Sequence, residues 1–166
     1  MTRLQPPLPS LLDKYHGAQF DSIYSTAVTV TGGECEHARA SGVARSDDGS
    51  LACDLRLPVE LGGPGGGTNP EQLFAAAYAA CFHGALSLLA ARRNIPVHGA
   101  SVEVKVTLGR DPVDGLFALA ADVRIALPGV ERSVAQALVR STERYCPYTK
   151  MARNGITSIV ALAGAA

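Results

Sequence analysis

The apolar run of residues 68–88 constrains the fold more than any other part of the chain. Its apolar side chains recur every three or four residues, a spacing that predicts an α-helix: Leu73, Phe74, Ala77, Tyr78, Cys81, Ala85 and Leu88. Pro70 suits the first turn, where its missing N–H would have no partner, and Thr68 is expected to cap the helix with Glu71 three residues later. Because residues 75–91 carry almost no charge, we expect this helix to be buried on most sides.

Segments of alternating apolar and polar residues precede and follow this helix, as is typical of half-buried strands. Strands are expected over residues 22–31, 42–47, 51–57, 101–108 and 117–127. A second amphipathic helix is expected over residues 130–145, ended by Pro147, and a closing strand over residues 156–162. Meanders and hairpins separated by single helices predict an α+β fold dominated by antiparallel sheet.

The length of 166 residues favours one domain. Residues 1–21 begin with several prolines and show no periodicity, so we interpret them as an N-terminal arm. The folded domain is then expected over residues 22–166.

Charge and composition exclude several classes of function. Lys plus Arg and Asp plus Glu each number 15, so nothing indicates a nucleic-acid or polybasic membrane surface. Polar residues interrupt the apolar run of residues 73–91, which argues against a membrane span, and the proline-rich start does not fit a signal peptide. We therefore expect a cytoplasmic protein, in which the four cysteines are free or redox-active rather than structural disulfides.

Two thiols carry the candidate chemistry. Cys81 lies in the middle of the apolar helix, and Cys146 stands where the second helix is expected to end. A buried cysteine alone is most often a small hydrophobic side chain. A second thiol in the motif Tyr145-Cys146-Pro147-Tyr148 favours redox chemistry instead.

These two stretches resemble one known family. The run Thr68-Asn69-Pro70-Glu71-Gln72-Leu73-Phe74 through Ala79-Ala80-Cys81-Phe82, followed by Cys146-Pro147-Tyr148, is similar to the OsmC/Ohr peroxidases, and closer to the organic hydroperoxide resistance branch. The resemblance extends over residues 22–163. It implies an intertwined homodimer in which the central helix is buried.

The resemblance also implies roles for individual residues. Cys81 would attack an organic hydroperoxide, Cys146 would resolve the product as a disulfide, and Glu71 would hold an arginine beside the thiolate. A dithiol, a lipoyl group on a protein, would reduce the disulfide, and neither a cofactor nor a metal is expected. The alternatives are a redox sensor or a protein that binds apolar ligands, and a general disulfide reductase.

The activating arginine is where this chain departs from the family pattern. The hydroperoxide-resistance branch has Gly-Gly-Arg after the first strand, whereas here Gly32-Gly33 is followed by Glu34. Arg39 is our first candidate for the activating cation, Arg56 the alternative and Arg45 a distant third. A cation is needed because burial raises the pKa of a thiol, and only the thiolate attacks a peroxide.

Helix geometry limits how Glu71 can act. Ten residues separate Glu71 from Cys81, about 15 Å along a helix. Either the arginine bridges part of that span, or Glu71 comes from a second subunit. Cys35 with His37 supplies only two potential metal ligands, too few for a site.

Overall fold

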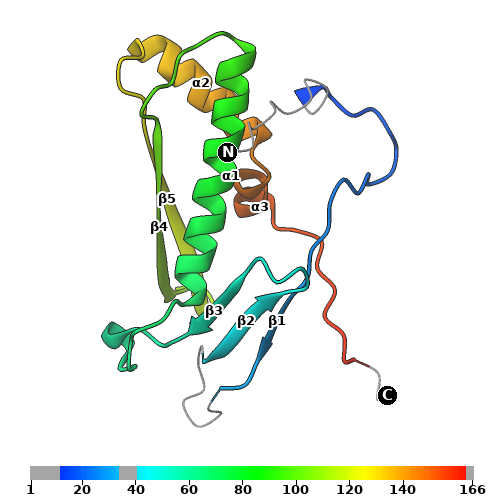
Figure 1. The fold of residues 1–166 in the computed structure, drawn as a ribbon, viewed down its shortest axis with the longest axis vertical. Coiled ribbons are helices and arrows are strands. Elements are labelled where there is room, and N and C mark those ends of the chain that lie inside the picture. Colours follow the sequence, from blue (N-terminus) through cyan, green and yellow to red (C-terminus); the bar gives the residue numbers. More distant parts are fainter. Residues whose placement is uncertain (1–11, 34–40, 164–166) are drawn as a thin grey trace. The chain divides into compact units, whose positions relative to one another are not determined.

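The structure is a computed structural model that describes residues 12–33 and 41–163. Helices and strands follow one another in an α+β order, as predicted (Figure 1). The elements are β1 (Val28–Thr31), β2 (Gly42–Ser46), β3 (Ala52–Leu55), the 3₁₀ helix η3 (Val59–Leu61), α1 (Pro70–Arg92), β4 (Ser101–Arg110), β5 (Phe117–Ala126), α2 (Arg132–Tyr145) and α3 (Pro147–Asn154).

The chain divides into two compact units. The described residues of the first, here called the helical unit, are Leu12, 78–103 and 123–163, which include most of α1 and all of α2 and α3. The described residues of the second, the sheet unit, are 13–33, 41–77 and 104–122. Each unit is described separately below.

The sheet unit contains an antiparallel meander in the order β1-β2-β3. Val30 pairs with Ala44, and Ala44 pairs in turn with Cys53. The turn between β2 and β3 is closed by Asp48, whose carboxylate accepts hydrogen bonds from Ser46 Oγ and the Ser50 backbone N–H; these bonds hold the pKa of Asp48 at about 2. The predicted strand over 22–31 is confirmed only from Val28 onward, since residues 22–27 are irregular.

Asn69, not Thr68, caps the N-terminus of α1. The backbone N–H of Gln72 donates to Asn69 Oδ1 at 2.8 Å, which satisfies an amide that has no partner inside the helix. Thr68 Oγ1 donates instead to the Gln72 side chain at 3.0 Å. The predicted capping box from Thr68 to Glu71 is therefore wrong by one residue, because Pro70 is the first helical residue and makes Asn69 the cap.

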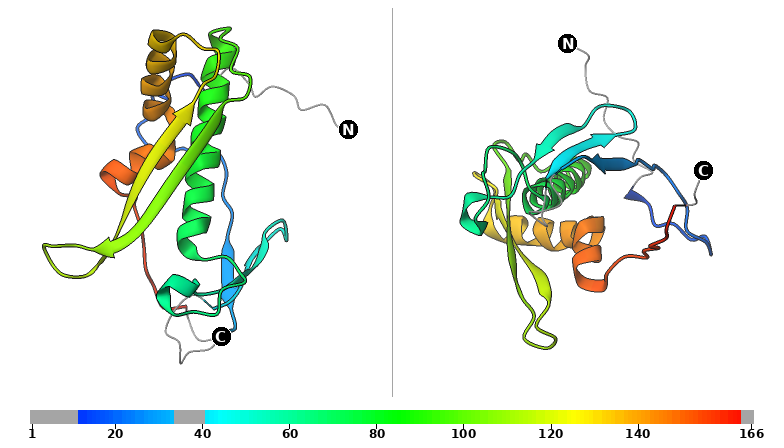
Figure 2. Two further views of the ribbon diagram at one scale, coloured as in Figure 1. Left: turned by 90° about the vertical axis from the view of Figure 1, so that its left-hand side faces the viewer. Right: turned by 90° about the horizontal axis from the view of Figure 1, so that it is seen from below.

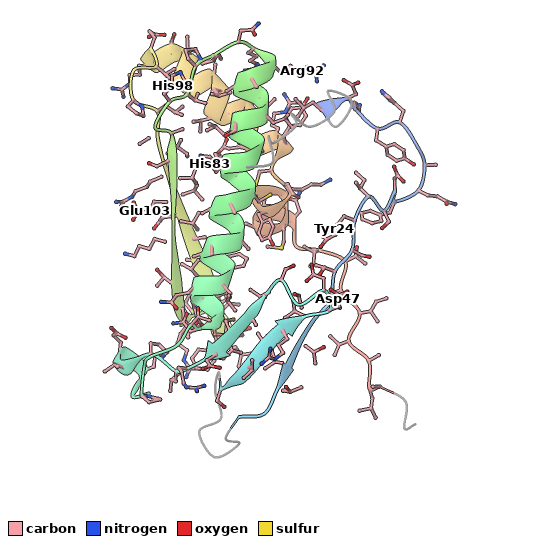
Figure 3. The ribbon with its side chains drawn as sticks, in the orientation of Figure 1. Tyr24, Asp47, His83, Arg92, His98 and Glu103 are labelled. Atoms are coloured by element: carbon pink, nitrogen blue, oxygen red, sulfur yellow. The ribbon has the colours of Figure 1, made fainter. Side chains whose placement is uncertain are left out.

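Helix α1 is a core helix that buries one face within a single chain. Its buried residues follow helical spacing: Tyr78, Phe82, Leu86, Leu89 and Ala90. The rest of its surface is half-buried or exposed, and Arg92 ends it (Figure 3). By length and composition alone, α1 could cross a membrane, because its mean hydropathy is 1.7. The polar residues of α1 therefore lower its hydropathy less than we expected from the sequence. Its buried face packs in the helical unit, where Arg93 just beyond α1 bonds to Ser141 of α2 at 2.9 Å.

Strands β4 and β5 form a two-stranded sheet whose strands run in opposite directions (Figure 2). The hairpin is closed where the Asp111 N–H donates to the Leu116 carbonyl at 2.8 Å, and Gly115 there adopts a positive φ of 74°. The predicted alternation holds along β4. In β5 it fails at its start, because Phe117 and Leu119 are 55% and 53% exposed in one chain.

Two consecutive helices close the described chain. Glu131 caps α2 by accepting the backbone N–H groups of Ser133 and Val134, and α2 buries Leu138 and Thr142. The sequence predicted α2 but not α3, which starts at Pro147 directly after Cys146. The predicted strand over 156–162 is wrong for the single chain: these residues pair with none of the described strands, and a strand forms only by pairing.

Candidate active site

Cys81 and Cys146 face each other in the helical unit. The Cys146 thiol donates to Cys81 Sγ with the two sulfurs 3.8 Å apart. Cys146 is fully buried, whereas Cys81 is half-buried. Thiols 65 residues apart in the sequence are thus brought together, and one of them is partly accessible.

The junction of α2 and α3 holds Cys146 in place. Its backbone N–H donates to the Thr142 carbonyl at 2.8 Å and so ends α2, while its carbonyl accepts from the Lys150 N–H at 3.2 Å in α3. The backbone of Cys146 is extended between these helices, with φ −72° and ψ 115°. Pro147 then takes the first position of α3, where its missing N–H is not needed. The backbone of Cys146 is therefore held by both helices.

The first turn of α3 also contacts α1 through a pair of tyrosines. The Tyr78 hydroxyl of α1 donates to Thr149 Oγ1 at 3.1 Å in a buried hydrogen bond. The Tyr78 ring stacks on the Tyr148 ring, with centroids 5.9 Å apart. Tyr148 of α3 therefore packs on Tyr78 of α1.

Burial and the neighbouring thiol disfavour the charged form of Cys81. Burial acts most strongly, followed by Cys146, and together they raise the pKa of Cys81 to about 11. The backbone N–H of Tyr148 opposes this shift by hydrogen bonding to the sulfur, which lowers the pKa. No cationic side chain of the described residues contributes to the shift. A reactive Cys81 thiolate therefore requires a cation in addition to these groups.

Of the candidate cations, Arg45 and Arg56 belong to the described residues of the sheet unit. Arg39 lies outside the described residues. Arg56 belongs to the sheet unit, where it donates to the Leu55 carbonyl at 2.8 Å and lies 3.7 Å from the carboxylate of Asp54. Arg45 is an exposed residue of β2. The role of each arginine stays a prediction.

Glu71 also belongs to the sheet unit. It lines a pocket of about 260 Å³ whose other walls are mostly apolar: Leu57, Pro58, Leu61, Asn69, Pro70, Leu108 and Phe117. Arg56 makes its ion pair with Asp54 and not with Glu71 in this part of the described chain. The role of Glu71 in holding an arginine stays a prediction.

Two of the remaining candidate residues, His83 and Cys53, are among those that the structure describes. His83 follows Cys81 by two residues and is exposed on α1 (Figure 3). Cys53 is half-buried on β3, and Cys35 and His37 lie outside the described residues. Within residues 12–33 and 41–163, no group of three or more potential metal ligands is present.

Comparison with known proteins places the chain in a family. The sequence model described as OsmC-like protein matches residues 63–160, more than half of the chain. An organic hydroperoxide resistance protein of Xanthomonas axonopodis pv. citri is 41% identical over 143 residues, which cover 85% of this chain and 95% of that protein. The chain belongs to the OsmC/Ohr family.

Solved structures of OsmC/Ohr proteins share the fold. An organic hydroperoxide resistance protein from Legionella pneumophila matches with a TM-score of 0.71 and 37% identity, over 81% of this chain and 93% of that one. OhrB of Bacillus subtilis matches with a TM-score of 0.68 and 38% identity, over 80% and 93% respectively. The predicted family and the α+β fold class are thereby confirmed, whereas the intertwined homodimer stays a prediction.

Sequence reasoning missed three groups near the thiols of this OsmC/Ohr protein: the Thr149 side chain, the backbone N–H of Tyr148 and the Tyr78 hydroxyl. Thr149 and the backbone N–H of Tyr148 come from α3, which was not expected, and Tyr78 was interpreted only as an apolar helix residue. A signal was present, since proline directly after a helix end also suits the first position of a new helix. Lys150 is exposed, and Arg153 pairs with Glu143 at 3.2 Å.

Proposed function

We propose that this protein reduces organic hydroperoxides to alcohols with Cys81 as the attacking thiolate and Cys146 as the resolving thiol. The proposal is supported by relatives of about 40% identity whose names refer to organic hydroperoxide resistance. One observation carries the proposal: the sulfur of half-buried Cys81 lies 3.8 Å from the sulfur of fully buried Cys146.

The first step oxidises Cys81. Its thiolate attacks the terminal oxygen of the hydroperoxide, the S–O bond forms as the O–O bond breaks, and the alkoxide takes up a proton and leaves as the alcohol. The peroxide is reduced by two electrons, and Cys81 becomes a sulfenic acid.

The second step forms the disulfide. The Cys146 sulfur attacks the Cys81 sulfur, the S–O bond breaks, and the hydroxide leaves as water with the proton of the Cys146 thiol. A disulfide has an S–S length of about 2.05 Å, so the sulfurs must approach by about 1.8 Å from their 3.8 Å separation. A dithiol then returns both thiols by two exchange reactions and becomes a disulfide itself.

A guanidinium is the group proposed to keep Cys81 ionised. Without one, the pKa of Cys81 is raised to about 11, so only about one thiol in ten thousand would be ionised at pH 7. Arg39 is the first candidate and Arg56 the alternative, with Glu71 as the carboxylate that orients the guanidinium.

The remaining parts of the proposal concern partners. We propose a lipoyl group on a protein, or another dithiol, as the reductant, and a homodimer as the working form in the cytoplasm. The homodimer is supported by apolar residues left exposed in one chain, such as Ile159 at 90% and Val160 at 96%.

Peroxide consumption by the purified protein tests the proposal. The assay supplies cumene hydroperoxide, with dihydrolipoamide as the reductant, to the wild type and to Cys81→Ser, Cys146→Ser and Cys53→Ser. We expect turnover that Cys81→Ser abolishes, that Cys146→Ser reduces strongly and that Cys53→Ser retains. Equal turnover in Cys81→Ser would overturn the proposal.

A second candidate is a redox sensor or an apolar-ligand binding protein built on the same fold. It is favoured by the glutamate that stands where the family has an arginine after Gly32-Gly33. Under this alternative, Cys81 reacts slowly with every hydroperoxide, and wild type and Cys81→Ser consume the peroxide equally slowly.

A further inference from the structure

We infer that Tyr78 and Thr149 are positioning residues that hold the first turn of α3 against the Cys81 sulfur. Neither residue reacts in the proposed mechanism. The inference rests on the proposed role of Cys81 as the attacking thiolate. It assigns a task to a buried polar contact that the mechanism itself does not use.

The contact joins one turn of α1 to one turn of α3. Tyr78 and Cys81 are three residues apart on α1 and therefore lie on the same face. Opposite them, Thr149 accepts the Tyr78 hydrogen bond, Tyr148 stacks on the Tyr78 ring, and Cys146 meets Cys81. The tyrosine–threonine bond thus lies beside the pair of thiols.

Burial protects this hydrogen bond from competition by water. Tyr78 and Thr149 are each only 4% exposed, so water cannot readily replace either partner. A buried hydroxyl without a partner is costly, and the bond therefore fixes the rotation and height of α3 relative to α1. The ring stacking alone would allow α3 to slide.

The position of α3 matters for Cys81 because the first turn of α3 presents backbone N–H groups. The first N–H groups of a helix have no acceptor inside it, and Tyr148 is the second residue of α3. Its N–H donates to Cys81 and favours the thiolate, as does the positive end of the helix. Among the described residues of the helical unit, the titratable groups at this contact are the Cys146 thiol, which disfavours the thiolate, and the phenols of Tyr78 and Tyr148.

The test removes single hydroxyl groups and keeps shape. Tyr78→Phe keeps the stacked ring, Thr149→Val keeps the branched side chain, and Thr149→Ser restores a hydroxyl. Tyr145→Phe, an exposed tyrosine of α2, is the matched control. Alkylation of Cys81 by iodoacetamide is followed against pH by mass spectrometry of its peptide, so that other thiols do not interfere.

We expect the midpoint of alkylation to rise by roughly half a pH unit or more in Tyr78→Phe and Thr149→Val, because the Tyr148 N–H no longer reaches the sulfur. At pH values above the midpoint, the alkylation rates of these two variants should converge with the wild-type rate. Thr149→Ser and Tyr145→Phe should match the wild type. Peroxide oxidation of Cys81 at pH 7 should slow severalfold in the two hydroxyl-deleting variants.

An unchanged midpoint in both hydroxyl-deleting variants, even with a lower melting temperature, would overturn the inference and leave the pair as core packing. If Tyr78→Phe does not fold, Thr149→Val and Thr149→Ser decide the matter. If Cys81 reacts with no hydroperoxide, the proposed function fails, whereas the alkylation profile still decides whether the pair positions α3.

Discussion

Cys146 Sγ lies 3.8 Å from Cys81 Sγ, and only Cys81 is partly accessible to solvent. A reagent that approaches the reduced protein therefore meets Cys81 first. The asymmetry suits a pair in which one thiol attacks an external substrate and the other reacts only with its neighbour. The same asymmetry predicts that an incoming molecule reacts at the Cys81 sulfur.

We accordingly predict that a bulky maleimide labels Cys81 well before Cys146. Labelling of Cys146 should be roughly tenfold slower or more, since it requires local opening of the α2–α3 junction. Peptide mass spectrometry on the reduced protein measures both rates, and the same reaction in urea gives the reference without burial. Equal rates in the folded protein would mean that the first turn of α3 opens readily.

The second prediction separates the two candidate arginines. Burial and Cys146 raise the pKa of Cys81 to about 11, and a nearby guanidinium lowers it. Removing the activating arginine should therefore shift the midpoint of Cys81 alkylation upward, toward 11. Below that midpoint, the rate should rise about tenfold for each pH unit, because only the thiolate reacts.

The measurement compares Arg39→Ala and Arg56→Ala, with Arg140→Ala on the exposed face of α2 as the control. We expect Arg39→Ala to shift the midpoint and Arg56→Ala to leave it close to the wild type, since Arg56 already pairs with Asp54. A shifted midpoint in Arg56→Ala, with none in Arg39→Ala, would instead assign activation of Cys81 to Arg56. A wild-type midpoint near 11 would mean that no arginine activates Cys81, and would favour a sensing or binding role.

Periodicity alone predicted much of this architecture. The apolar spacing around Tyr78 and Phe82 identified α1, and the alternation in residues 101–108 identified β4, because burial on one face imposes a period on any regular element. The pairing of Cys81 with Cys146 came from the family resemblance, since no local pattern reports a contact across 65 residues.

Other features depend on atoms that a pattern does not specify. Asn69 and Thr68 are both good caps, and only the start of α1 at Pro70 decides between them. The helix α3 has eight residues, too short for a clear period. The tail over 156–162 has the composition of a strand, but a strand needs a partner, and none of the described strands pairs with it.

The third prediction concerns the cap of α1. Asn69→Ala should lower the free energy of unfolding by about 1 kcal/mol, because the Gln72 N–H loses its acceptor. Thr68→Ala should cost less, since its hydroxyl bonds to an exposed side chain. Asn69→Asp keeps the acceptor and serves as the control. Urea denaturation measures all three variants, and a larger loss in Thr68→Ala would restore Thr68 as the cap.

The last prediction concerns the exposed tail. Ile159, Val160 and Leu162 are 90%, 96% and 98% exposed in one chain, which is an unfavourable position for three large apolar side chains. A second copy that paired with residues 156–162 would cover them and supply a strand partner, which none of the described strands of one chain provides. We therefore expect the wild type to have about twice the 17.2 kDa mass of one chain in light scattering.

Ile159→Asp with Val160→Asp should yield monomers, because two buried charges would oppose the contact, whereas Thr157→Asp, a single change at a polar position, should weaken the dimer less. A wild type that is monomeric at micromolar concentration would contradict the homodimer and require that the tail stays exposed.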